Sequence, residues 1–224
     1  MEKELSKAVL ANISIPEDTA HIFAETAHRF EEMMMMYQCA IQEVTTKLEV
    51  LSREMSVRNN RNPIETIKFR IKKPKSIAEK LIRNGFEVSV DSASQNLNDV
   101  AGVRVICSFI EDIYTIAKML TSQDDIHLVN VKDYIKNPKE NGYRSYHMII
   151  EIPVFFSDRK QYMRVEVQIR TMAMDFWASL EHKVRYKKDI PNSEEMALRL
   201  KKCADVIAAT DAEMLKIAQE INII

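Results

Sequence analysis

The stretch RVEVQIRT, residues 164–171, decides the fold, because its alternation of apolar and polar side chains is the pattern of a β-strand. Successive side chains of an extended strand point to opposite faces, so Val165 and Val167 share one face. Glu166 and Gln168 share the other, between two arginines. The apolar face belongs in a core, whereas the polar face is either a solvated surface or the floor of a site.

Outward from this stretch, short apolar runs alternate with segments of helical spacing. We expect strands over 64–71, 102–110, 126–135, 145–156 and 162–170, and helices over 76–85, 111–120 and 171–188. This order predicts an α/β (α+β) fold, in which a mixed sheet of about five strands carries flanking helices.

Long helices are expected at both ends of the chain. Between residues 17 and 58 no Gly or Pro interrupts apolar residues spaced by three and four: Ala20, Phe23, Ala27, Phe30, Met34, Tyr37, Ile41, Val44, Leu48, Leu51 and Met55. A helix of some 40 residues spans about 60 Å, but a compact domain of this size is about 45 Å across. The helix therefore bends sharply or extends beyond its own domain.

The C-terminal segment repeats this spacing with Leu200, Cys203, Ile207, Thr210, Met214, Ile217 and Ile221. Two such helices could pack on each other or on further copies of the chain, and oligomerisation is favoured. We expect three regions: an N-terminal helical region (1–59), a mixed α/β domain (60–190) and a C-terminal helix (191–224).

Composition excludes several classes of protein. The 224 residues carry a net charge of −1, so attraction to polyanions must come from local patches. No apolar run approaches the roughly 20 residues of a membrane helix, and the N-terminus does not resemble a signal peptide. Cys39, Cys107 and Cys203 are odd in number and far apart, which suits reduced thiols in the cytoplasm.

Only three glycines occur, and they are too widely spaced for a Rossmann or P-loop motif: Gly85, Gly102 and Gly142. Side-chain cations would therefore have to bind any nucleotide phosphates. Between residues 68 and 83 seven basic residues face one acidic residue, Glu79: Lys68, Arg70, Lys72, Lys73, Lys75, Lys80 and Arg83. A charge run is usually a solvated face, but Ser76, Lys80 and Arg83 share one helical face near an N-terminus that favours anions.

Two acids and one loop complete the candidate site. Asp99 begins a strand, where an acid is often just a turn cap, and it would bind Mg²⁺ only beside a second carboxylate such as Glu166. In KENGYRSYH, residues 139–147, Tyr143 follows a glycine and could stack on a nucleobase. These features suggest Mg²⁺-dependent chemistry on nucleoside polyphosphates.

Four stretches resemble the synthetase domain of the RelA/SpoT family: RIKKPKSIAEKL, NDVAGVRVICSFIEDIY, VKDYIKNPKENGYRSYH and VEVQIRTMAMDFWASLEHKVRYK. The resemblance covers about residues 60 to 190, and the short chain is similar to the stand-alone small alarmone synthetases. It implies a nucleotidyltransferase-like synthetase fold and a cytoplasmic GTP pyrophosphokinase. Such an enzyme transfers the β,γ-pyrophosphate of ATP to the 3′-OH of GDP or GTP, giving AMP and ppGpp or pppGpp in the stringent response.

The resemblance also implies residue roles. Adenine would lie between Arg70 and Arg104, and the ATP phosphates would meet Lys72, Ser76, Lys80 and Arg83. Asp99 matches the Mg²⁺ ligand. Glu166 matches the carboxylate beside the 3′-OH, a general base and second metal contact, and Tyr143 matches the aromatic that stacks on guanine. Further acceptor contacts are expected at Lys139, Arg144, His147, Gln168 and Asp175. Arg164 and Arg170 either line the site or form its solvated rim.

Family members of this kind form homotetramers through their terminal helices, which would give both apolar seams a purpose. No His-Asp dipeptide, on which the hydrolase half of the longer relatives depends, occurs in the chain, so we expect synthesis without hydrolysis. Two alternatives stay open: another Mg²⁺-dependent nucleotidyltransferase, and a non-enzymatic module that binds RNA through the basic run at 68–83. Two acids within the site argue against RNA as a partner, since carboxylates repel a phosphate backbone.

Overall fold

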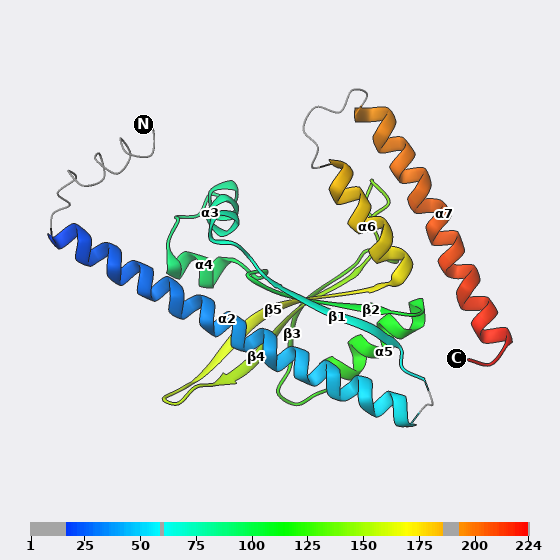
Figure 1. Ribbon diagram of the computed structural model, residues 1–224, viewed down its shortest axis with the longest axis horizontal. Helices are drawn as coiled ribbons and strands as arrows, with labels where there is room; N and C mark the ends of the chain where they lie inside the picture. The colour runs from blue at the N-terminus through cyan, green and yellow to red at the C-terminus, as the bar shows by residue number, and fades with distance from the viewer. Residues whose placement is uncertain (1–16, 59–60, 186–192, 224) are drawn as a thin grey trace, which may run out of the picture.

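A computed structural model describes residues 17–58, 61–185 and 193–223 (Figure 1). The helices are α2 (Glu17–Arg58), α3 (Pro74–Arg83), α4 (Val90–Asn96), α5 (Ile110–Thr121), α6 (Met172–Arg185) and α7 (Ser193–Glu220). The strands are β1 (Ile64–Ile71), β2 (Ala101–Cys107), β3 (His127–Asp133), β4 (Tyr146–Phe155) and β5 (Lys160–Thr171). The expected α+β fold with a five-stranded sheet is confirmed.

The sheet has the order β1-β2-β5-β4-β3, with the RVEVQIRT strand in the middle. Strands β2 and β5 run parallel, and the other three neighbouring pairs are antiparallel, so the sheet is mixed. The parallel pair needs a long crossover, which runs through α5, β3 and β4. β5 therefore has a hydrogen-bonded strand on each side.

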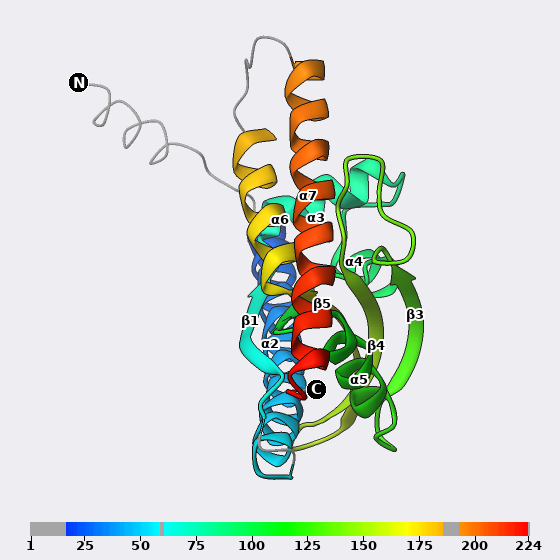
Figure 2. The same ribbon diagram turned by 90° about the vertical axis from the view of Figure 1, so that its right-hand side faces the viewer.

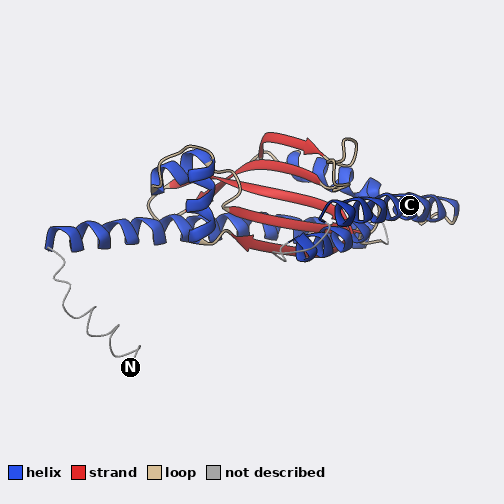
Figure 3. Ribbon diagram, turned by 90° about the horizontal axis from the view of Figure 1, so that it is seen from above, coloured by secondary structure: helices blue, strands red, loops and turns tan. Residues whose placement is uncertain are grey.

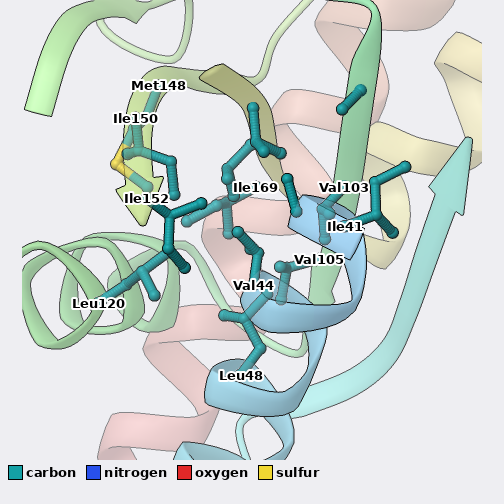
Figure 4. Packing of buried hydrophobic residues seen from close by; sticks show 14 of the residues in the cluster. Ile41, Val44, Leu48, Val103, Val105, Leu120, Met148, Ile150, Ile152 and Ile169 are labelled. Atoms are coloured by element: carbon teal, nitrogen blue, oxygen red, sulfur yellow. The ribbon is translucent and has the colours of Figure 1, made fainter. Parts of the chain in front are cut away.

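The apolar face of the sheet packs on α2 and α5 (Figure 4). Val167 and Ile169 of β5 are fully buried there, as the alternation in RVEVQIRT predicts. Val44 and Leu48 of α2 lie against them and are also fully buried. Burying each such side chain contributes about 1.5–3 kcal/mol. This packing holds β5 in place, and its polar side chains are then directed to the opposite face.

Helix α2 is continuous, and its N-terminal turns extend past the sheet rather than bending back (Figure 3). The fully buried residues of α2 begin at Met33, whereas Ile22 is exposed and Phe30 is only half-buried. The seam therefore packs on the sheet over its C-terminal half. The N-terminal part of α2 leaves apolar side chains exposed to solvent.

The side of helix α7 that is buried within the chain coincides only in part with the expected apolar seam. Its buried residues are Ala204, Asp211 and Ala218, with Leu200 and Ile207 partly covered. Small side chains allow a close approach to α6, and the large residues Met214, Ile217 and Ile221 are exposed instead. The short helix α4 was not expected from the sequence. It is capped by Ser89, whose hydroxyl accepts a hydrogen bond from the amide of Ser92.

The boundaries proposed at residues 59–60 and 190–191 fall outside the described residues, as does the end of the helix expected over 171–188. No helix in the described part of the chain combines the length and the hydropathy that crossing a bilayer requires.

Candidate active site

Two rows of residues run across the polar face of the sheet, each taking one residue from every strand. In the order β1-β2-β5-β4-β3, the first row is Arg70, Gly102, Glu166, Ile149 and Asn130, and the second is Lys68, Arg104, Gln168, His147 and Lys132. Residues two apart on a strand share a face, so both rows belong to the same surface. Glu166 and Gln168 lie at the centre of these rows, and the RVEVQIRT strand supplies the floor of a polar site.

Asp99 lies in the turn before β2 and faces this surface from one side. The Nζ atoms of Lys72 and Lys80 lie 2.8 Å and 2.7 Å from the same carboxylate oxygen, Oδ2. Lys72 directly follows β1 and Lys80 lies on α3, so the basic run is folded back onto the acid. Burial alone would raise the pKa of Asp99, but the hydrogen bonds and charges of both lysines outweigh it and lower that pKa.

The second oxygen of Asp99, Oδ1, is buried and has no hydrogen-bond partner. Such an orphaned oxygen is expensive unless a ligand satisfies it. Within the described residues no three His, Cys, Asp or Glu side chains gather to enclose a metal. Mg²⁺ usually needs only one or two carboxylates, with water and substrate phosphates as its other ligands. Asp99 and Glu166 therefore suit a Mg²⁺ ion that enters with a nucleotide.

Both oxygens of Glu166 accept hydrogen bonds. Gln168 Nε2 donates to Oε2 at 2.8 Å, and His147 Nδ1 lies 3.3 Å from Oε1. Burial would raise the pKa of Glu166, but its contacts with His147 and Gln168 bring that pKa below its ordinary value. The carboxylate is therefore ionised and held in one orientation, as a proton acceptor should be.

His147 is itself oriented by a hydrogen-bond chain. Arg170 Nη2 donates to the hydroxyl of Tyr143, and that oxygen lies 2.8 Å from His147 Nε2. Burial lowers the pKa of His147, and a neutral imidazole has one donor and one acceptor nitrogen. Arg170 can only donate, so the Tyr143 oxygen accepts from it and the Tyr143 hydroxyl donates its own proton to Nε2 of His147. The proton of the neutral imidazole is then on Nδ1, which donates to Glu166.

Asp175, at the start of α6, is the shared partner of three cations, Lys68 and Arg104 of the second row and Arg170 next to it. Lys68, Arg104 and Arg170 each place a nitrogen 3.3 Å from one of its carboxylate oxygens. Arg170 is 4% exposed and also donates to Ser145 and Gln168. Removal of Asp175 or of Arg170 would leave the other buried charge without its partner. This cluster therefore fixes the floor of the site.

Two pockets lie on either side of Glu166. One lies over β1 and β2 and is lined by Lys68, Phe69, Arg70, Gly102, Val103, Arg104 and Gln168. The other lies toward β3 and β4 and is lined by Lys80, Asn84, Asn96, Asn98, Asp99, Asn130, Lys132, Tyr134, Lys139, His147, Ile149 and Glu166. Lys68, Arg70 and Arg104 bring positive charge to the first pocket, and amides and charged groups of both signs line the second. The arrangement can hold two different polyanionic ligands with a carboxylate between them.

Eight of the fourteen expected site residues line one of these two pockets: Arg70, Lys80, Asp99, Arg104, Lys139, His147, Glu166 and Gln168. The other six line neither pocket: Lys72, Ser76, Arg83, Tyr143, Arg144 and Asp175. Arg83 is exposed at the end of α3, and Ser76 is half-buried on the same helix. Arg144 donates to the carbonyl of Ile135, and it borders a small cavity against α7 instead. Arg164 binds Glu151 and Asn98 at the rim.

Sequence reasoning left the role of Arg170 open and did not assign Asn98, Asn130 or Tyr134. The signal for Arg170 was its place on the polar face of β5, two residues after Gln168. The other three come from separate loops and strands, and no local pattern brings them together.

A five-stranded mixed sheet with two basic pockets, the second of which holds the carboxylates of Asp99 and Glu166, defines the class of a nucleotide-binding synthetase. The family model described as "Region found in RelA / SpoT proteins" matches residues 69–191, and the chain belongs to this family. Within it, the chain is 43% identical over 189 residues to GTP pyrophosphokinase YwaC of Bacillus subtilis strain 168, covering 84% of this chain and 90% of that protein.

Solved structures show the same likeness. Small alarmone synthetase 1 from Bacillus subtilis, bound to its product pppGpp, gives a TM-score of 0.79 at 34% identity, covering 87% of this chain and 99% of that one. The same enzyme bound to AMPCPP gives a TM-score of 0.72 at 29% identity, covering 87% of this chain and 98% of that one. The family and fold expected from the four sequence stretches are thus confirmed.

Proposed function

We propose that this chain is a GTP pyrophosphokinase, which transfers the β,γ-pyrophosphate of ATP to the 3′-OH of GDP or GTP. The observation that carries the proposal is Glu166, an ionised carboxylate on the central strand that lines the second pocket and pairs with Gly102 of the first. The relatives named GTP pyrophosphokinase, and the complexes with pppGpp and AMPCPP, support both nucleotides as substrates.

ATP would occupy the pocket over β1 and β2. Arg70 and Arg104 border it, and guanidinium planes stack well on an adenine ring. Lys72 and Lys80 lie beyond it and would exchange Asp99 for the ATP phosphates, which carry more negative charge. Ser76 and Arg83 are proposed as additional phosphate contacts, made when the nucleotide reaches α3.

The acceptor nucleotide would occupy the pocket toward β3 and β4. Lys139, His147 and Gln168 are proposed to contact it, and Tyr143 is proposed to stack on guanine. Arg144 and Asp175 would act from behind, since Asp175 holds the arginines of the floor. Lys139 already lies over the rings of Tyr134 and Tyr143, at 4.6 Å and 4.9 Å from their centroids.

In the reaction, the 3′-oxygen attacks the β-phosphorus, the bond between that phosphorus and the α-phosphate oxygen breaks, and AMP leaves. Glu166 would take the proton of the 3′-OH at Oε1 or Oε2. Asp99 and Glu166 are proposed as the ligands of a Mg²⁺ ion, which would neutralise charge on the transferring pyrophosphate. Lysines and arginines would position the phosphates, because phosphoryl transfer needs orientation and charge neutralisation more than covalent help.

The test is a product assay with purified protein, ATP, Mg²⁺ and either GDP or GTP. AMP and a guanosine tetra- or pentaphosphate, resolved by anion-exchange chromatography, are the expected products in equal amounts. Release of pyrophosphate with an oligonucleotide product would show another nucleotidyltransferase instead. Salt-sensitive RNA binding with no turnover would show a binding module.

We propose that the protein makes the alarmone without hydrolysing it, since no His-Asp dipeptide occurs in the sequence. Incubation of purified pppGpp with the protein and Mg²⁺ or Mn²⁺ should leave the nucleotide intact. We also propose a cytoplasmic location, with which the free thiols of Cys39, Cys107 and Cys203 agree.

A homotetramer is proposed as the assembly. The exposed residues Met214, Ile217 and Ile221 on α7 and Ile22 on α2 support it, because they leave apolar surface on both terminal helices. Light scattering coupled to size-exclusion chromatography would measure the mass. A monomer of 26.0 kDa at micromolar concentration would contradict it.

A further inference from the structure

The C-terminal helix α7 packs directly against the loop that carries Tyr143. A Cβ atom added to Gly142 would lie only 2.5 Å from the Cβ atom of Ala204 on α7. Gly142 also has a φ angle of +86°, a conformation that side chains other than glycine rarely adopt. The loop and the helix therefore touch at a point where two small residues are required.

Helix α7 is held in this place by α6, beside which it runs (Figure 2), and by one hydrogen bond from the end of β5. Trp177 of α6 donates to the carbonyl of Leu200 at 2.9 Å, and the indole is buried with Ala204. Thr171, the last residue of β5, donates to Asp211 at 2.7 Å, and Asp211 is buried. The tyrosine ring of the loop packs on the same cluster.

The loop is fixed internally as well. The amide of Gly142 donates to the carbonyl of Lys139 at 2.8 Å, and Asn141 donates to Glu181 of α6 at 3.1 Å. Such a tight turn moves as a unit, so a shift of Gly142 away from α7 would also shift Tyr143. The tyrosine hydroxyl would then lose its 2.8 Å contact with His147.

We infer that Ala204 of α7 is a positioning residue for Tyr143, and that the C-terminal helix thereby sets the affinity of the enzyme for its acceptor nucleotide. This inference rests on the proposed function, in which Tyr143 stacks on guanine. The pocket proposed for ATP is lined by residues of β1, β2 and β5, and the ATP affinity should not depend on this contact.

Steady-state kinetics of three variants test the inference. Ala204→Leu would push α7 and the loop apart, and the KM for GDP and GTP should rise about tenfold or more, because small misplacements near a site are costly. The KM for ATP should stay within about twofold of wild type. Ala204→Ser, which adds only a hydroxyl group, should leave the KM for the acceptor close to that of the wild type. Ala209→Leu is the matched control, because Ala209 is exposed on the same helix.

A second measurement uses the wild-type protein and needs no variant to fold. Trp177 is the only tryptophan of the chain, and it lies between α6 and α7 next to the loop. Its fluorescence should change when GDP is added without ATP, and should not change with a non-hydrolysable ATP analogue alone.

An unchanged acceptor KM in Ala204→Leu, or an equal increase for both nucleotides, would overturn the inference. The inference would also be overturned if Trp177 fluorescence did not change with GDP, or if it changed equally with GDP and with the ATP analogue. Either result leaves the proposed activity intact if wild-type protein makes AMP and the alarmone in the same assay. Absence of those products would instead refute the proposed function.

Discussion

His147 Nδ1 lies 3.3 Å from Glu166 Oε1, so the imidazole holds the carboxylate from the side of the acceptor pocket. On the opposite nitrogen, Tyr143 holds the imidazole. His147, which the sequence predicted only as a nucleotide contact, thus also orients Glu166, the proposed general base.

We predict that His147→Ala lowers kcat by about tenfold to a hundredfold, because the carboxylate loses its orientation. The KM for ATP should change little, since His147 does not line the pocket over β1 and β2. His127→Ala is a suitable control, because His127 is exposed on β3. A kcat of His147→Ala equal to that of the control would show that the contact has no role.

Glu166→Gln should retain nucleotide binding and lose most turnover, by a factor of about 10²–10⁴, which is the usual contribution of a general base. Single-turnover product formation and calorimetric binding of GDP would separate the two effects. Glu151→Gln on the neighbouring strand, where Glu151 binds Arg164, is the matched control. Near-wild-type turnover in Glu166→Gln would remove the base from this residue.

Asp99→Asn should reduce stability at neutral pH, because Lys72 and Lys80 lose their common carboxylate. The pKa of Asp99 is lowered in the folded protein, so the unfolded state binds more protons between the two pKa values. The stabilisation is complete above the ordinary pKa of 3.8 and is lost as the pH falls through the lower, folded value.

Urea unfolding should therefore show a constant difference between wild type and Asp99→Asn from about pH 8 to about pH 5.5, which narrows below about pH 4. A difference that narrows near pH 6 would place the responsible titration elsewhere. The same variant should also lose Mg²⁺-dependent product formation.

Gly102→Val should weaken ATP binding while GDP binding is kept. A Cβ atom at Gly102 would lie 3.5 Å from Cγ of Arg70, which is an ordinary contact. The two methyl groups beyond it would fill the pocket between Arg70 and Arg104. We expect at least a tenfold increase in the Kd of an ATP analogue, equivalent to about 1.4 kcal/mol. Thr66→Val, exposed on β1, controls for the added strand propensity, and equal affinities in both variants would contradict the prediction.

The sheet was predictable because each strand has a local sequence pattern. Alternation in RVEVQIRT requires only neighbouring residues, and the buried Val165 and Val167 appear where a period of two places them. Helix α4 could not be found in this way, because its seven residues, VDSASQN, lack an apolar period. It depends on the cap at Ser89, a signal shared by many turns.

The spacing of large apolar residues could not show which side of α7 packs within the chain, where Ala204 and Ala218 are buried and Met214 and Ile217 are exposed. The same limit holds in the site. Lys72 and Lys80 were expected near phosphate, yet their joint contact with Asp99 depends on how α3 folds back beside β2. The chain from Arg170 through Tyr143 to His147 links residues of β5, a loop and β4, and only the tertiary structure brings them together.

The two cross-strand rows also constrain how this enzyme can diverge. Four strand spacings of about 4.8 Å give a site some 19 Å wide, and every strand supplies one residue to each row. Insertions at the β4–β5 hairpin tip would leave all ten positions in place, whereas a one-residue slip within any strand would exchange its polar and apolar faces. Substrate preference can therefore evolve by point substitutions along the rows. Insertions or deletions inside the strands would instead disrupt the site.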